Sequence, residues 1–175
     1  QLIEHNLLGT VNLLEYCKRY KAGLILLSTS RVYSAENLAQ LPVKSNGREF
    51  SFKEGFDEEG VSPLGISESF PTTSPLSLYG ASKLASETLI HEYGQCFDFP
   101  VWINRCGVMA GAGQFGKADQ GIFSYWIHSF REKKPLKYIG FGGKGLQVRD
   151  ALSPKDLVPL LFKQMEEPNK QAPRI

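Results

Sequence analysis

The chain has little cysteine, no long apolar run and almost no net charge. Its three cysteines, Cys17, Cys96 and Cys106, lie far apart among 175 residues, so neither a disulfide framework nor a zinc cluster is expected. Apolar runs such as residues 24–27 are far shorter than the roughly 20 residues that cross a bilayer. With 20 basic and 18 acidic residues, the net charge of +2 is too small to attract nucleic acid or an anionic membrane. We therefore expect a cytoplasmic protein that binds neither membrane nor nucleic acid.

Helical and strand-like segments alternate along the chain. Apolar side chains between Ile3 and Leu14 recur at helical spacing, which predicts a helix that ends in the basic residues 18–21. The apolar run 24–27 then predicts a strand that is buried on both faces. The same reasoning predicts a helix at 78–97, a strand at 101–104, and helices at 122–133 and 154–167. This alternation indicates an α/β fold with a mainly parallel sheet.

The segments between these elements are rich in glycine, proline and serine. Residues 34–75 form a long irregular stretch, and such a stretch inside a compact domain is more often a functional loop than a passive connection. A glycine-rich loop is predicted at 107–121. Residues 136–139 and 146–149 flank a turn, which predicts either a hairpin or two strands at a sheet edge.

The pattern G-x-G-x-x-G, which can cradle a pyrophosphate, occurs twice, at residues 111–116 and 140–145. Such a cradle needs a strand directly before it and a helix directly after it. Residues 140–145 run into an extended segment, so we interpret them as a turn. Residues 111–116 are several positions away from the nearest strand and helix, which makes them a weak match to a dinucleotide site.

A tyrosine and a lysine one helical turn apart form the first candidate for chemistry. Tyr79 precedes Lys83 by four residues, and these positions share one face of the predicted helix 78–97. An ammonium beside a phenol stabilises the phenolate and lowers its pKa from about 10, which makes the phenol a general base. The alternative is an ordinary exposed pair of side chains on a helix surface.

Thr29 lies at the carboxyl end of the strand predicted at 24–27, where ligands of open parallel sheets bind. A hydroxyl at this position could hydrogen-bond a substrate oxygen while Tyr79 exchanges that oxygen's proton. The alternative is that residues 28–30 only form a strand-ending turn.

Five groups of residues are distributed along nearly the whole chain. The groups are Asn6-x-x-Gly9-Thr10, Leu27-Ser28-Thr29-Ser30-Arg31-Val32-Tyr33, Glu68-Ser69-Phe70-Pro71, Tyr79-Gly80-Ala81-Ser82-Lys83-x-x-x-Glu87, and Gln147-Val148-Arg149-Asp150 followed by Asp156-Leu157. Taken together and in this order, they resemble the extended short-chain dehydrogenase/reductases, the NAD-dependent epimerase/dehydratase family. The implied fold is a partial Rossmann-like parallel sheet with helices on both faces, plus a small substrate-binding subdomain.

The resemblance also implies a reaction and a set of site residues. A tightly held NAD would remove a hydride from a sugar carbon and return it on the opposite face. The implied catalytic residues are Tyr79 as acid and base, Lys83 as its activator and ligand of the nicotinamide ribose, and Thr29, which orients the hydroxyl. The implied cofactor-binding residues are Asn6, Leu27, Tyr79, Lys83 and Cys106, and the implied substrate-binding residues are Thr29, Val108, Gln114 and Arg149.

Two of these assignments have structural alternatives. Arg149 matches the family position that binds the nucleotide diphosphate, but it could instead form a surface ion pair with the acids beside it. Asn6 matches a helix position near the cofactor, and a capping or buried structural role is equally open.

The substrate implied is a CDP- or UDP-hexose. Residues 113–116, 119–121 and 145–150 are most similar to those of family members that act at C2 of a CDP-hexose. A UDP-hexose 4-epimerase or a sugar-nucleotide oxidoreductase is the first alternative, and a non-catalytic module for nucleotide binding or dimerisation is the second. Dehydration is disfavoured because Ser30-Arg31 stands where the family's dehydratases carry Asp-Glu.

We expect residues 1–106 to be the C-terminal part of the NAD-binding domain, and residues 107–175 to be mainly a truncated substrate-binding part. The family's first strand, Gly-rich turn and helix have no counterpart in this sequence, so the chain resembles a fragment with weak NAD binding and negligible turnover by itself. Residues 6–20 and 78–97 match the helices that commonly form the family's dimer, so a homodimer is implied.

Overall fold

The computed structural model describes residues 1–117 and 120–167; the end of the domain predicted at 107–175 lies outside the described residues. These residues divide into two compact units. The first contains Gln1–Leu41, Gly55–Cys106 and the described residues from Pro159 onward, and the second contains Pro42–Glu54 and Gly107–Val158. The chain therefore crosses between the units directly after Cys106, and the short segment 42–54 belongs with the second unit.

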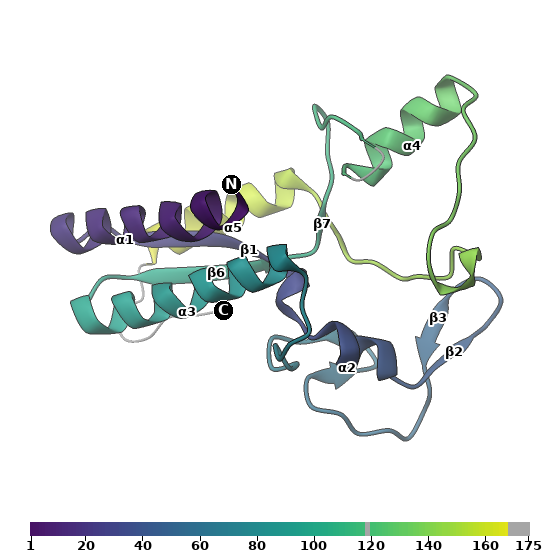
Figure 1. The fold of residues 1–175 in the computed structure, drawn as a ribbon, viewed down its shortest axis with the longest axis horizontal. Coiled ribbons are helices and arrows are strands. Elements are labelled where there is room, and N and C mark those ends of the chain that lie inside the picture. The colour runs from purple at the N-terminus through teal and green to yellow at the C-terminus, as the bar shows by residue number, and fades with distance from the viewer. Residues whose placement is uncertain (118–119, 168–175) are drawn as a thin grey trace. The chain divides into compact units, whose positions relative to one another are not determined.

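The elements follow one another in the order that Figure 1 shows. The helices are the π-helix η1 (Glu4–Leu8), α1 (Gly9–Tyr20), the 3-10 helix η2 (Ser30–Val32), α2 (Ala35–Gln40), α3 (Leu78–Phe97), α4 (Ile122–Arg131), the 3-10 helix η3 (Phe141–Gly143) and α5 (Pro154–Glu166). The strands are β1 (Leu24–Thr29), β2 (Val43–Ser45), β3 (Phe50–Phe52), β4 (Val61–Ser62), β5 (Gly65–Ile66), β6 (Val101–Cys106), β7 (Val108–Met109) and β8 (Ala151–Leu152).

A parallel pair of strands, β1 and β6, forms the centre of the first unit. Leu24 pairs with Val101 at one end and Thr29 pairs with Cys106 at the other. Both strands were predicted, and each extends two residues further than the apolar runs at 24–27 and 101–104 indicated. The extra residues are polar or lie at the carboxyl ends, where hydrophobicity alone does not mark a strand.

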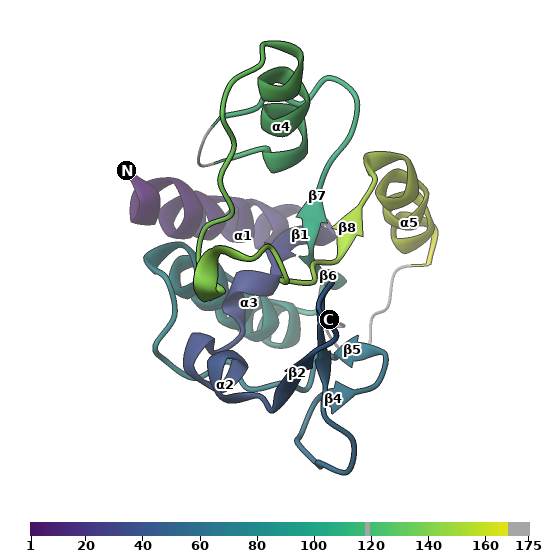
Figure 2. The same ribbon diagram turned by 90° about the vertical axis from the view of Figure 1, so that its right-hand side faces the viewer.

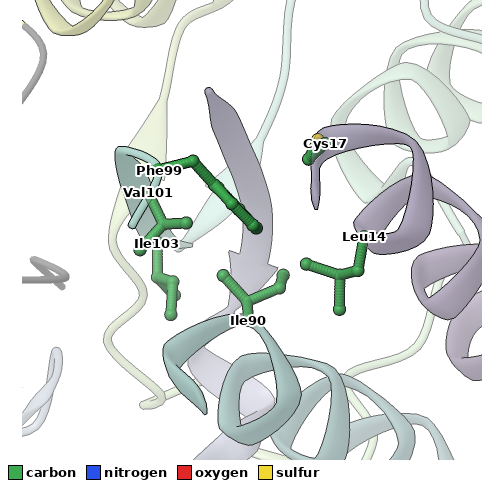
Figure 3. Close-up of a cluster of buried hydrophobic side chains, with 6 residues drawn as sticks. All are labelled: Leu14, Cys17, Ile90, Phe99, Val101 and Ile103. Carbon is green, nitrogen blue, oxygen red and sulfur yellow. The ribbon is translucent and has the colours of Figure 1, made fainter. Parts of the chain in front are cut away.

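Buried apolar side chains of α1, α3 and β6, together with Phe99, form the core of this unit (Figure 3). Its buried members are Leu14 and Cys17 from α1, Ile90 from α3, Phe99, and Val101 and Ile103 from β6. Alternate residues of a strand point to opposite faces, so Leu24 and Leu26 pack on this cluster from the same side of β1. Removing this apolar surface from water holds α1 and α3 against one face of the strands.

The helix α5 lies on the opposite side of the strand pair from α1 and α3 (Figure 2). Asn104 of β6 and the buried Gln164 of α5 exchange two hydrogen bonds through their side-chain amides, at 2.9 and 2.8 Å. Helices therefore lie on both faces of a parallel sheet, and the predicted α/β fold class is confirmed. The helix predicted at 78–97 is found at the same residues, and the helices predicted at 122–133 and 154–167 end slightly earlier, at Arg131 and Glu166.

The prediction of extended strands at 136–139 and 146–149 was wrong. The residues between the two segments do not have extended backbone. Positive φ angles occur at Gly140, Phe141, Gly142, Gly143 and Gly145, so no strand pairing forms here. The Leu146 carbonyl instead accepts a hydrogen bond from the Phe50 amide at 2.8 Å. The strand that does form, β8, begins at Ala151 and pairs in parallel with β7. No α-helix follows residues 140–145 directly, which agrees with their interpretation as a turn.

The long stretch 34–75 is less irregular than its composition indicated. It contains α2 and the two antiparallel pairs β2–β3 and β4–β5. In the part of the chain that the structure describes, no helix has the length and hydrophobicity needed to cross a membrane. The same residues contain no group of three or more histidine, cysteine and acidic side chains that could hold a metal ion.

Candidate active site

The carboxyl ends of β1 and β6 bring Thr29 and Cys106 side by side. The two residues are partners in the parallel register, and each is the last residue of its strand. The Thr29 hydroxyl accepts a hydrogen bond from the Arg31 amide at 3.2 Å, which caps the first turn of η2. The predicted strand-ending turn is therefore present, and Thr29 lies at the sheet edge where a ligand was expected.

The first turn of α3 carries Tyr79 and packs closely against the segment that follows β1. Ser77 caps the helix by accepting a hydrogen bond from the Gly80 amide at 3.0 Å. A Cβ atom built on Gly80 would lie 2.1 Å from the carbonyl oxygen of Arg31, so only glycine permits this approach. Because Arg31 also binds Thr29, the helix turn that holds Tyr79 is in direct contact with the segment that caps Thr29.

Lys83 lies one turn after Tyr79 and interacts electrostatically with the end of β6. Burial lowers the pKa of the Lys83 amine, and electrostatic interactions with Glu87 and Cys106 act in the opposite direction. Burial also raises the pKa of the Cys106 thiol. The Tyr79 side chain is 39% exposed, and its hydroxyl makes no hydrogen bond to any described residue.

Asn6 of the π-helix η1 is joined to α3 by a series of hydrogen bonds. Its side-chain amide donates to the Ser82 hydroxyl at 3.0 Å, and Ser82 donates to the Tyr79 carbonyl at 2.8 Å. The Asn6 carbonyl accepts hydrogen bonds from the hydroxyls of Thr10 at 2.6 Å and Ser86 at 3.1 Å. Asn6 thus fixes η1 to the N-terminal half of α3, which is the structural role that the sequence left open.

Leu27 lies on the face of β1 opposite the core cluster, because it alternates with the inward-facing Leu26 and Ser28. It is 37% exposed, so it offers an apolar surface two residues before Thr29. Thr29, Cys106, Tyr79 and Lys83 belong to the same compact unit as Leu27.

A buried ion pair beside Lys83 was missed by the sequence reasoning. The Arg105 guanidinium binds the Glu87 carboxylate, with a shortest distance of 2.8 Å, and the two side chains are only 8% and 3% exposed. The signal was present in the sequence, since Glu87 lies three residues before the core residue Ile90 and therefore shares its face of the helix. A carboxylate on a buried face needs a partner, but the sequence does not say which cation supplies it.

The remaining candidate residues, Val108, Gln114 and Arg149, belong to the second unit. The Val108 amide donates to the Asp150 carbonyl at 2.9 Å, and the Gln114 side chain donates to the Met109 carbonyl at 3.0 Å. Arg149 is exposed and forms no ion pair with any residue in 1–117 or 120–167. The surface ion pair that was the alternative for Arg149 is thus not present among these residues.

Gln114 also lines an open hollow of about 470 Å³ in the second unit. The loop 110–114 forms one wall, and Phe123, Ser124, Ile127 and His128 of α4 form the other. Most of this lining is apolar, with a few polar groups, as is common in sites for small organic ligands.

A model of the NAD dependent epimerase/dehydratase family matches residues 1–175. The chain belongs to this family. The resemblance predicted from the five groups of motifs is therefore confirmed, and the family is NAD dependent, as the motifs implied.

Individual relatives differ in substrate. The chain is 29% identical over 174 residues to CDP-paratose 2-epimerase of Salmonella typhi, covering 95% of this chain and 48% of the relative. It is 29% identical over 151 residues to UDP-glucuronate 4-epimerase of Thermodesulfobacterium geofontis, covering 85% of this chain and 36% of the relative. The chain thus spans about half or less of the length of these relatives.

A solved structure agrees with the fold over the whole chain. UDP-glucuronic acid 4-epimerase from Bacillus cereus, in complex with UDP-glucuronic acid and NAD, is 28% identical with a TM-score of 0.69. The match covers 99% of this chain and 45% of that one. The dTDP-glucose 4,6-dehydratase of Bacillus anthracis, 23% identical with a TM-score of 0.70, shares the fold.

The contact at Gly80 predicts opposite effects for two glycine substitutions. Gly80→Ala should lower the free energy of unfolding by about 1–3 kcal/mol, because the new methyl group overlaps the Arg31 carbonyl. Gly9→Ala is the matched control, since Gly9 is helical and a Cβ there would meet only the Glu4 carbonyl, at 3.9 Å. It should raise the free energy of unfolding by about 0.5–1 kcal/mol. Denaturant unfolding measures both, and equal effects would contradict the close packing.

Proposed function

We propose that this chain forms the catalytic and substrate-binding part of an NAD-dependent nucleotide-sugar epimerase. The observation that carries the proposal is the contact between the turn of α3 that bears Tyr79 and the segment that caps Thr29. Lys83 lies one turn further along the same helix. A phenol, an ammonium and a hydroxyl in this arrangement are suited to moving a proton to and from a sugar hydroxyl.

The residues at the strand ends fit one part of an NAD molecule. The half-buried amine of Lys83 can donate hydrogen bonds to ribose hydroxyls, and the exposed side chain of Leu27 offers an apolar surface to a flat ring. When bound, NAD supplies the capacity to accept a hydride from a sugar carbon and to return it. Cys106 lies beside Thr29 and would border the same space.

The proton chemistry is assigned to Thr29, Tyr79 and Lys83. Thr29 donates a hydrogen bond to the sugar oxygen and so orients its hydroxyl. The Tyr79 phenolate accepts the proton of that hydroxyl as the carbon loses its hydride, which leaves a ketone. Lys83 stabilises the phenolate by its positive charge. Tyr79 returns the proton when the ketone is reduced on its opposite face, so no net oxidation occurs and one stereocentre is inverted.

Arg149 and the hollow beside Gln114 are assigned to the nucleotide part of the substrate. An exposed guanidinium without an ion-pair partner among the described residues is suited to a diphosphate, which it can bind with two parallel hydrogen bonds. The hollow has the size and apolar lining expected of a site for part of a nucleotide sugar. Val108 starts β7 in the same unit and would border this site.

We favour C2 of a CDP-hexose as the reacting position. The likeness of residues 113–116 and 145–150 to CDP-paratose 2-epimerase supports this choice, as does the identity of 29% to that relative. A UDP-hexose 4-epimerase is the second candidate, supported by the similarity to two UDP-glucuronate 4-epimerases. Dehydration is disfavoured because the exposed Arg31 stands where an acid would be needed.

Product analysis of the whole protein with NAD tests the proposal. CDP- and UDP-hexoses are supplied in turn, and NMR identifies the carbon whose configuration changes. Tyr79→Phe should lower turnover by about 10²–10⁴-fold, because the proton acceptor is removed. The control is Tyr93→Phe on the same helix, where the hydroxyl donates a hydrogen bond to Glu15 at 2.7 Å; this variant should retain turnover. Inversion at no carbon, or full activity of Tyr79→Phe, contradicts the proposal.

We also propose a homodimer in which α1 and α3 form the contact. Leu13, Tyr16 and Tyr20 of α1 are 56%, 57% and 58% exposed, and contiguous apolar surface of this kind is commonly covered by a partner. Sedimentation of the whole protein should give twice the chain mass, and Leu13→Asp combined with Tyr16→Asp should give a monomer. A wild-type monomer would contradict the dimer.

A further inference from the structure

The buried carboxylate of Glu87 accepts hydrogen bonds from side chains of both central strands. It accepts bonds from Arg105 Nη2 at 2.8 Å and from Arg105 Nε at 3.1 and 3.3 Å. The Ser28 hydroxyl donates to the same carboxylate from β1. A buried charge is costly without such partners, so these hydrogen bonds offset the cost of burying the Glu87 side chain.

Arg105 connects the carboxylate to two further segments of the first unit. Its Nη1 donates to the Glu68 carbonyl at 3.0 Å, and its guanidinium lies 5.3 Å from the centre of the Tyr33 ring. The Tyr33 ring in turn meets the edge of the buried Phe70 ring at 5.9 Å. The ion pair therefore ties the middle of α3 to the end of β1, to the residues after η2 and to the segment 68–70.

Glu87 lies one helical turn after Lys83, on the same helix. The charged and titratable groups that act on the Lys83 amine are Glu87 from α3 and Cys106 from β6. Burial lowers the pKa of Lys83, and the Glu87 carboxylate opposes that effect. A Lys83 amine that lost its proton could no longer stabilise a phenolate at Tyr79.

We propose that Glu87 is a positioning residue of the active site, in which Arg105 and Ser28 fix its carboxylate as the counter-charge of Lys83. This inference rests on the proposed function, because Lys83 matters only if Tyr79 is the acid and base. It assigns to Glu87 an electrostatic role in addition to the mechanical one of joining α3 to β1.

The test follows the titration of Lys83 in the whole protein. NMR of lysine labelled with carbon-13 reports the protonation of each amine, and Lys83→Arg identifies the Lys83 signal. In Glu87→Gln the negative charge is lost, so Lys83 should lose its proton at a pH lower by about one unit or more. The alkaline limb of the pH profile of turnover should move to lower pH by the same amount.

Two controls separate this role from a structural one. Glu92→Gln removes an equal charge from an exposed position of α3 and should leave the Lys83 titration and the pH profile unchanged. Glu87→Asp keeps the charge but withdraws it by one methylene, so the shift should be in the same direction and smaller. If Glu87→Gln does not fold, the Lys83 titration in Glu87→Asp serves as the test instead.

The proposal is overturned if Glu87→Gln lowers turnover equally at every pH while Lys83 titrates as in the wild type. An unchanged Lys83 titration in Glu87→Asp overturns it as well when that variant alone folds. The NMR titration does not depend on turnover. If the wild-type protein converts no nucleotide sugar, the proposed function fails, and the electrostatic coupling of Glu87 to Lys83 is still measured independently.

Discussion

The contact between the first turn of α3 and the segment that follows β1 is the constraint on which the site depends. The strand pair fixes Thr29 beside Cys106, but nothing in that pairing positions a helix. The absence of a side chain at Gly80 allows the helix backbone to meet the Arg31 carbonyl, and Arg31 also binds the Thr29 hydroxyl. The close approach of the Gly80 and Arg31 backbones thus links Thr29, at the end of β1, to the first turn of α3, which carries Tyr79.

Two kinds of interaction hold α3 in this position: the apolar core and the buried ion pair. Apolar packing of Leu14, Ile90 and Ile103 presses α1 and α3 onto the strands, but it is non-directional and tolerates small shifts of a helix along its axis. The ion pair of Glu87 with Arg105 is directional, because a guanidinium and a carboxylate bind in a fixed planar geometry. Buried ion pairs often contribute little net stability, so we infer that this pair serves mainly to fix the position of α3.

Local sequence signals predicted the elements that carry the site. The helix at 78–97 has a serine cap and helical spacing, and the spacing of Tyr79 and Lys83 follows directly from it. The strands 24–27 and 101–104 were marked by apolar residues, but their last two residues were not. The strands predicted at 136–139 and 146–149 do not form, and the strand that does form, β8, pairs with β7, which is distant in sequence. The partner of Glu87 was unpredictable for the same reason, since Arg105 lies on another element. The roles of Thr29, Tyr79, Lys83 and Arg149 remain predictions.

A crystal structure of the whole protein with NAD and a nucleotide sugar is the most direct test of the convergence of Thr29 and Tyr79. We predict that the Thr29 Oγ and the Tyr79 Oη lie within about 3 Å of the same sugar oxygen, the distance of an ordinary hydrogen bond. A sugar bound elsewhere, or a Tyr79 hydroxyl directed away from the oxygen that Thr29 binds, would contradict the account.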